Sequence, residues 1–201
     1  MLTLFHSPQS RSSRMIWLLE ELGADYEIAY VEIPRADGTG APDPRNPHPD
    51  KKVPALVHDG ALITESAAIM LYLTDLFPDA GLGPQVGDPE RGPYLTWLAY
   101  YAGVIEPVLT FAFLGLGDNE GLVRTFRGQA EMNARVLAAL DGKDYLLGSG
   151  FSAADILIAS IGHWARDMLP QGEIMDAYLA RCGARPALAR SMSKDAVPVQ
   201  A

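Results

Sequence analysis

Two short motifs in the first third of the chain have residue types suited to holding a small peptide. The first is V-P-A-L, Val53 to Leu56, and the second is T-E-S-A-A-I, Thr64 to Ile69. Pro54 lies where a buried strand should begin, although proline removes a hydrogen-bond donor from a sheet. A cis peptide bond at Val53-Pro54 would explain this position, because it turns the backbone and exposes the amide and carbonyl of Val53 to a ligand.

The second motif predicts a helix that begins at Glu65-Ser66. The first N–H groups of a helix have no intrahelical partner and lie at the positive end of its dipole, so they attract anions. One site would then offer a strand-like edge to an extended peptide and a helix terminus to a carboxylate. The structural alternative is that Pro54 opens an edge strand and Glu65 caps the first turn, where a carboxylate is favourable by about 0.3–1 kcal/mol without any ligand.

The elements around these motifs follow a β-α-β, irregular, β-β-α order. Hydrophobic periodicity and turn residues predict them in sequence as strand Leu2–Phe5, helix Arg11–Leu22, strand Tyr26–Ile33, loop Pro34–Pro49, strands Ala55–His58 and Ala61–Ile63, and helix Thr64–Phe77. The first unit should be parallel and right-handed. Asp59-Gly60 between the last two strands predicts a hairpin. This order is typical of a thioredoxin-like domain and gives an α/β N-terminal half, residues 1–78.

Strand signals nearly vanish after a Gly-, Pro- and Asp-rich linker over residues 79–93. The pattern predicts an all-α second domain over residues 94–201, with helices Tyr94–Leu116 (kinked at Pro107), Glu120–Leu140, one opening at Phe151–Asp155, Ile174–Arg181 and Pro186–Lys194. Ser152 and Asp155 have the spacing of a capping box, and we interpret them as structural.

Composition and charge argue against several kinds of partner and site. The net charge of −9 over 201 residues disfavours nucleic acid as a partner. A single cysteine, Cys182, allows no internal disulfide and no C-x-x-C redox site. The histidines show no metal-ligand spacing, so we expect no metal; they are His6, His48, His58 and His163. No apolar run reaches the roughly 18 residues of a membrane span, and no signal peptide is evident. We therefore expect a cytoplasmic protein without a membrane partner.

The motifs and their order resemble those of the cytosolic glutathione transferases, in particular bacterial, beta-, theta- or zeta-like members. The matching segments run along the whole chain: S-P-Q-S-R-S-S-R, W-L-L-E-E-L-G-A-D-Y-E, V-P-A-L, T-E-S-A-A-I and F-S-A-A-D-I. Glutathione is a small peptide with a carboxylate at each end, which fits the site described above. The resemblance implies a thioredoxin-like domain followed by a helical domain, a homodimer, and attack of the glutathione thiolate on a small hydrophobic electrophile in a detoxification role.

Three serines before the first helix compete to stabilise that thiolate: Ser7, Ser10 and Ser12. Ser10 falls where beta-class members carry a reactive cysteine and within the serine cluster of zeta-like members. Ser12 is the second candidate, and Ser7 precedes a proline and suits a turn. The structural alternative is that all three serines merely cap the helix. Serine in place of cysteine excludes a mixed disulfide at this position, and no tyrosine takes its place.

One serine hydroxyl at the start of the helix suffices to lower the pKa of the glutathione thiol by the required amount. The pKa of a free thiol is about 8.5, and lowering it by about two units requires that the protein favour the thiolate over the thiol by roughly 2.7 kcal/mol. A charge-assisted hydrogen bond supplies about 1.5–3 kcal/mol and a helix N-terminus about 0.3–1 kcal/mol.

The resemblance also implies roles at the peptide ends of glutathione. Glu65 would face the ammonium group, while Ser66 and its N–H would hold the adjacent carboxylate, and Val53 would pair with the peptide backbone. Lys51 or Lys52 would reach the glycine carboxylate, with solvated loop lysines as the alternative interpretation.

The electrophile pocket is assigned to the first helix of the second domain. Glu106 falls where beta-class members often carry a histidine that lines this pocket, and Tyr101 and Phe111 are its predicted apolar wall. Two other functions stay open on the sequence: a non-catalytic binding or interaction protein of the same fold, and a glutathione-dependent isomerase or dehalogenase.

Overall fold

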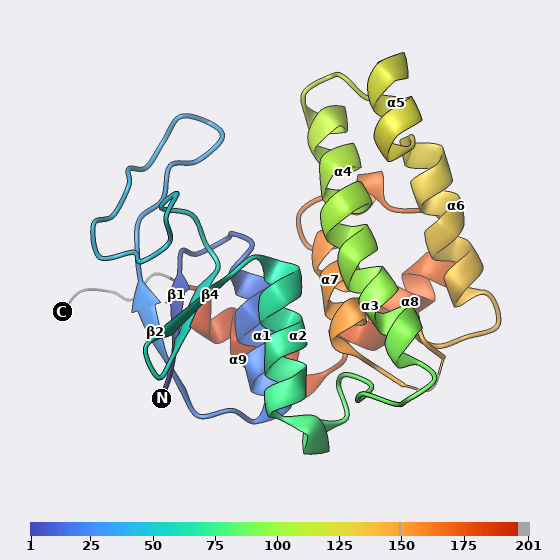
Figure 1. The fold of residues 1–201 in the computed structure, drawn as a ribbon. Coiled ribbons are helices and arrows are strands. Elements are labelled where there is room, and N and C mark those ends of the chain that lie inside the picture. The colour runs from blue at the N-terminus through green and yellow to red at the C-terminus, as the bar shows by residue number, and fades with distance from the viewer. Residues whose placement is uncertain (149, 197–201) are drawn as a thin grey trace. The chain divides into compact units, whose positions relative to one another are not determined.

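A computed structural model of the chain describes residues 1–148 and 150–196 (Figure 1). The contacts divide these residues into two compact units. The N-terminal unit comprises Met1–Ala80 together with the segment from Arg185 onward, and the helical unit comprises Gly81–Ala184. The prediction of an α/β domain followed by an all-α domain is confirmed.

A four-stranded sheet forms the centre of the N-terminal unit. Its strands are β1 (Leu2–His6), β2 (Tyr26–Tyr30), β3 (Ala55–His58) and β4 (Ala61–Thr64), in the order β2-β1-β3-β4. β1 runs parallel to β2, whereas β1 with β3 and β3 with β4 are antiparallel. The predicted β-α-β unit and the predicted hairpin are both present. The second strand ends at Tyr30, three residues earlier than predicted.

Helix α1 (Ser13–Leu22) connects β1 to β2, and its consecutive apolar residues bury most of its surface. Met15, Ile16 and Leu18 are fully buried. The helix ends at Gly23, which has a φ of 62° and so occupies the left-handed conformation that glycine adopts without a Cβ penalty. Helix α2 (Ser66–Leu76) and a 3-10 turn (Pro78–Ala80) complete the N-terminal segment.

The last helix, α9 (Pro186–Lys194), packs against α1 in the N-terminal unit, although the sequence places it in the second domain. Charge complementarity explains the packing. Arg185 donates two hydrogen bonds to Glu21, at 2.6 and 2.7 Å. Arg190 and Lys194 both reach Glu20, at 2.8 and 2.6 Å. A domain boundary predicted from composition cannot detect such pairing between distant segments.

The helical unit contains α3 (Arg91–Tyr100), a π-helical turn η2 (Tyr101–Ile105), α4 (Glu106–Phe113), α5 (Glu120–Phe126), α6 (Gln129–Leu140), α7 (Ala153–Ile161), a 3-10 turn (Arg166–Met168) and α8 (Glu173–Gly183). The predicted helix over Tyr94–Leu116 is interrupted immediately before Pro107. The proline ring excludes the usual carbonyl position four residues back, and a π-helical turn relieves that clash.

The predicted single helix Glu120–Leu140 is wrong. The chain leaves the helical conformation at Arg127, where φ is 80°, and Gly128 begins α6 in an extended conformation. Glu131 accepts a hydrogen bond from the N–H of Gly128 at 3.1 Å and so stabilises the new start. Glycine is a weak helix former, which makes this the point where the helix breaks.

The helical run Arg91–Phe113 spans 23 residues and is long and apolar enough to cross a membrane by length and composition alone. The amino-acid sequence alone did not predict an apolar run of this length. A core helix of a globular protein passes the same test, and Tyr94, Tyr101 and Ile105 on this run are each at most 1% exposed. These residues form the core of the helical unit.

Candidate functional site

The register of the sheet brings the predicted site residues to one edge of the N-terminal unit. Phe5 pairs with Ala55, and Ala55 pairs with Thr64. The turn that follows β1, the Val53-Pro54 bond that precedes β3 and the Glu65-Ser66 step that follows β4 therefore lie at the same end of adjacent strands. The Val53-Pro54 peptide bond is cis, as predicted.

Backbone conformation marks the same edge. Gln9, Lys51 and Glu65 have positive φ angles of 54°, 54° and 69° although none is glycine. Such conformations cost about 1–3 kcal/mol each and persist where the surrounding structure enforces them, often at functional sites. All three belong to segments singled out from the sequence: the serine turn, the Lys51-Lys52 pair and the Glu65-Ser66 step.

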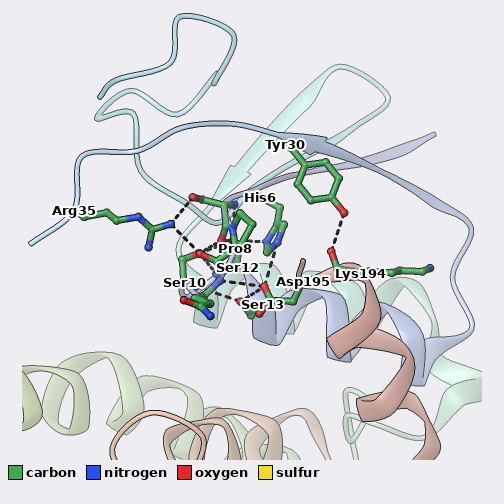
Figure 2. Close-up of polar contacts among 11 residues, drawn as sticks. His6, Pro8, Ser10, Ser12, Ser13, Tyr30, Arg35, Lys194 and Asp195 are labelled. Atoms are coloured by element: carbon green, nitrogen blue, oxygen red, sulfur yellow. Dashed lines mark hydrogen bonds and ion pairs between the residues drawn. The ribbon is translucent and has the colours of Figure 1, made fainter. Parts of the chain in front are cut away.

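The serine cluster is a connected set of hydroxyl groups between β1 and α1 (Figure 2). The oxygens Oγ of Ser10 and Ser12 lie 2.7 Å apart. The Ser10 hydroxyl donates to the carbonyl of Ser7 at 2.6 Å, and Ser12 Oγ accepts from the N–H of Ser7 at 3.2 Å. The two competing serines are therefore one hydrogen-bonded pair.

Burial separates the two serines. Ser12 is fully buried, whereas Ser10 is only partly buried. Helix α1 begins at Ser13, and Ser12 at its N-cap forms no side-chain capping bond. The alternative that these serines merely cap the helix therefore fails for Ser12. Ser10 lies three residues before the helix, and its carbonyl accepts the first hydrogen bond, from the N–H of Ser13 at 3.0 Å.

Two residues beside the serine pair were not predicted from the sequence: His6, which contacts Ser12, and Asp195, which contacts His6. His6 is fully buried, and its Nδ1 lies 2.8 Å from Ser12 Oγ. Its Nε2 lies 3.2 Å from Asp195 Oδ1, an ion-pair contact without the alignment of a hydrogen bond. The alternating burial of β1 would have identified His6 as an inward residue. No sequence signal places Asp195 here, because it follows α9, nearly two hundred residues away.

Asp195 also fixes the serine turn itself. Its Oδ1 accepts from the Ser13 hydroxyl at 2.6 Å and from the N–H of Gln9 at 3.2 Å. Burial raises the pKa of the Asp195 carboxyl, but the contacts with His6 and Ser13 outweigh it and leave this pKa below its ordinary value. The carboxylate is therefore the stable form, and it lies next to His6 and the turn (Figure 2).

Arg35 is a third residue that the sequence did not indicate. Its Nη2 donates to Ser7 Oγ at 3.1 Å and to the carbonyl of Pro8 at 2.9 Å. The predicted loop, Pro34–Pro49, begins with this contact and so holds the serine turn from outside. The serine turn is thus contacted both by the long loop and by the residue that follows α9.

The peptide-end residues lie on the same edge. Glu65, at the N-cap of α2, is exposed, and Ser66 is partly buried as the first helical residue. Lys51 donates to the carbonyl of Asn46 at 2.7 Å and thereby closes the loop. Lys52 is exposed. Of the two lysines, Lys52 is the one whose side chain the loop structure does not use.

The three predicted pocket residues all belong to the helical unit. Tyr101 is 1% exposed and donates to Glu106 Oε1 at 2.9 Å. Phe111 is partly buried and contacts Phe126 edge to face, with ring centroids 5.4 Å apart. Burial of Tyr101 leaves Glu106 and Phe111 as the members with accessible atoms.

Comparison with known proteins gives consistent matches. Residues 1–75 match the family model of the glutathione S-transferase N-terminal domain. A probable glutathione S-transferase of Nicotiana tabacum is 30% identical over 166 residues, covering 82% of this chain and 70% of that protein. Glutathione S-transferase GstA of Escherichia coli O157:H7 is 29% identical over 197 residues, covering 96% and 98%. A sphingomonad glutathione S-transferase, solved in complex with glutathione, is 27% identical with a TM-score of 0.74, covering 96% and 98%.

Proposed function

Since the chain belongs to the glutathione S-transferase family, we propose that the edge defined by Ser10, Val53 and Glu65 binds glutathione and that Ser10 stabilises its thiolate. The chain is a glutathione transferase, with glutathione as its co-substrate. The assignment to Ser10 rests on its exposure. Ser10 and Ser12 form a hydrogen-bonded hydroxyl pair at this edge, and Ser10 is the member that is partly exposed. The glutathione complex of the sphingomonad relative supports the ligand.

The peptide of glutathione would lie antiparallel to the backbone of Val53, which precedes β3 at this edge. Ser66, with its hydroxyl and N–H at the start of α2, would hold the γ-glutamyl carboxylate. The exposed Glu65 would pair with the neighbouring ammonium, and Lys52 with the glycine carboxylate. The ammonium and the glycine carboxylate then each face a group of opposite charge, and the γ-glutamyl carboxylate faces neutral hydrogen-bond donors at a helix N-terminus.

The Ser10 hydroxyl would stabilise the thiolate by turning from the Ser7 carbonyl, its acceptor in the free protein, to the sulfur of glutathione. It donates to the Ser7 carbonyl at 2.6 Å. A thiolate at this edge is a charged acceptor, and hydrogen bonds to charged groups contribute about 1.5–3 kcal/mol, against about 0.5–1.5 kcal/mol for a neutral pair. The difference favours rotation of the hydroxyl toward sulfur.

The finer features of the transferase reaction are proposals of the same kind. A small hydrophobic electrophile would contact Glu106 and Phe111 in the helical unit, with the buried Tyr101 holding Glu106 in place through its hydroxyl. The protein would act as a homodimer with a self-complementary two-fold interface. Sedimentation equilibrium at micromolar concentration should give twice the 21.7 kDa chain mass, and a single 21.7 kDa species would contradict the dimer.

Titration of the bound thiol tests the role of Ser10. In Ser10→Ala the pKa of bound glutathione should rise by about one to two units, since one unit corresponds to about 1.36 kcal/mol. Affinity for glutathione should change little, because the peptide ends are held elsewhere. Ultraviolet absorbance of the thiolate against pH reads the pKa, and calorimetry reads the affinity.

Ser193→Ala is the matched control, because this exposed serine of α9 bonds only to a carbonyl of its own helix, that of Arg190, at 2.7 Å. It should leave the titration unchanged. A shift in Ser12→Ala without one in Ser10→Ala would move the role to Ser12. No shift in either variant would mean that the hydroxyl mechanism is wrong.

A further inference from the structure

His6 is a fully buried titratable group that thiolate stabilisation by Ser10 does not use. It is joined to Ser10 by two short contacts, Ser10 Oγ to Ser12 Oγ at 2.7 Å and Ser12 Oγ to His6 Nδ1 at 2.8 Å. Only Ser10 of these three is partly exposed. A continuous row of proton-exchanging atoms therefore leads from the proposed thiol position into the interior (Figure 2).

We propose that His6 takes up the proton that glutathione loses, by way of Ser10 and Ser12, and that Asp195 positions His6 and balances its charge. The inference rests on the proposed function, since it needs a thiol at Ser10. It adds to that function a destination for the proton inside the protein.

The transfer is balanced along the row. The Ser10 hydroxyl first turns from the Ser7 carbonyl to Ser12 Oγ, which lies 2.7 Å away. The S–H bond of glutathione then breaks and its proton binds Ser10 Oγ, while the Ser10 proton moves to Ser12 Oγ and the Ser12 proton moves to His6 Nδ1. The products are a thiolate and an imidazolium. In that state His6 donates to Ser12, Ser12 donates to Ser10, and Ser10 donates to sulfur. The same shift thus turns the Ser10 hydroxyl toward the thiolate.

The surroundings of His6 favour this direction of transfer. Asp195 Oδ1 lies 3.2 Å from Nε2, so the neutral ring should carry its proton on Nε2 and keep Nδ1 as an acceptor. Within the described part of the chain, the ring of Tyr30 of β2 also packs against His6, edge to face with centroids 5.5 Å apart. Its hydroxyl donates to the Lys194 carbonyl at 2.8 Å. Lys194 Nζ is paired with Glu20, and Arg35 holds Ser7.

Counting protons tests the relay. In weakly buffered solution near neutral pH, a pH indicator reports protons released on glutathione binding, and ultraviolet absorbance reports the thiolate formed. The parent protein should release clearly less than one proton per thiolate, because His6 retains part of it. His6→Asn keeps an acceptor near the Nδ1 position but cannot take up a proton. It should release one proton per thiolate and form less thiolate at the same pH.

His58→Asn is the matched control. His58 lies in the same sheet, with its Nδ1 2.6 Å from the hydroxyl of Tyr72 and its Nε2 3.5 Å from Asp59. It pairs with Leu2, at the other end of β1 from His6. This variant should release as few protons as the parent. A merely structural His6 would change stability or affinity in His6→Asn but would leave the proton count at one in parent and variant alike, and that result overturns the relay.

A second measurement does not depend on a variant that folds. The ring nitrogen chemical shifts of His6 in the parent should move to imidazolium values with saturating glutathione and should not do so with S-methylglutathione, which has no thiol proton. Unchanged shifts with glutathione overturn the proposal. The thiolate titration of Ser10→Ala distinguishes the two failures: a normal shift there with no His6 protonation rejects only the relay, whereas no shift rejects the proposed function.

Discussion

Each unit of the protein contains an aspartate surrounded by serine and backbone donors, and the two sites are built differently. Asp155 in the helical unit is fully buried and accepts four hydrogen bonds. They come from the N–H groups of Leu146 and Ser152 at 2.9 and 2.8 Å, and from the hydroxyls of Ser152 and Tyr178 at 3.0 and 3.2 Å. Asp195 in the N-terminal unit has a side chain that is 24% exposed and holds a turn next to a histidine.

The difference separates a structural network from one that can change. Around Asp155, the donors converge on the two oxygens of a single acceptor, so rearrangement would break bonds without making new ones. In the serine turn that Asp195 holds, the hydroxyls of Ser10 and Ser12 both reach the Ser7 carbonyl, at 2.6 and 3.4 Å, and His6 Nε2 has only an ion-pair contact. Protons in such a row can reverse direction without loss of partners. This property, more than residue type, makes the serine turn the candidate for chemistry.

Removing each carboxylate gives the largest expected contrast. Asp155→Ala leaves three donors without an acceptor in the core, since the Tyr178 hydroxyl keeps the carbonyl of residue 155 at 3.3 Å, and should lower the free energy of unfolding by about 3–5 kcal/mol. Asp195→Ala should cost only about 1 kcal/mol, because water can reach the turn. Urea unfolding of the full chain measures both.

Similar losses of stability in the two alanine variants would contradict the distinction between a structural aspartate and one that serves the site. Weaker thiolate formation in a folded Asp195→Ala variant would support that distinction. Tyr178→Phe is an intermediate variant: it removes one donor from Asp155 but keeps the packing of the ring, so a loss near about 1 kcal/mol is expected.

The sequence predicted the secondary-structure elements and the sheet edge that forms the candidate site better than it predicted contacts between distant segments. Periodicity located the strands and α1, and local turn chemistry located the Asp59-Gly60 hairpin, because these features depend on neighbours along the chain. The Ser152–Asp155 capping box was likewise predicted and is present. The break at Gly128 was missed, since one glycine inside a helical pattern is often tolerated.

The site was predicted only where its residues belong to local motifs. Ser10, Val53 and Glu65 were found because a turn, a proline and a helix start mark them. Asp195 and Arg35 reach the serine turn through tertiary packing, Asp195 by way of α9 and Arg35 from the long loop. Nothing in the residues near either position indicates such a contact. The assignment of α9 to the second domain hid Asp195 for the same reason.

The smallest expected effect is a difference in how stability depends on pH. The pKa of Asp195 lies below its ordinary value of 3.8, so its contribution to stability is fully present above that value and is lost as pH falls below it and through the lower folded-state pKa. Burial raises the pKa of Asp155, and its hydrogen bonds offset this only in part. Its contribution therefore has the opposite sign: it is complete at low pH and declines as pH rises through the folded-state pKa.

Charge-neutral variants isolate the two contributions. Asp195→Asn should remove a loss of stability on acidification that amounts to less than about 1 kcal/mol, because the side chain is partly exposed. Asp155→Asn should instead remove a decline in stability on raising the pH. The free energy of unfolding in urea, measured at intervals between about pH 2 and pH 7 and subtracted from that of the parent, gives each slope. Slopes of the same sign would show that the two aspartates are electrostatically alike, and the distinction between them would then depend on hydrogen-bond connectivity alone.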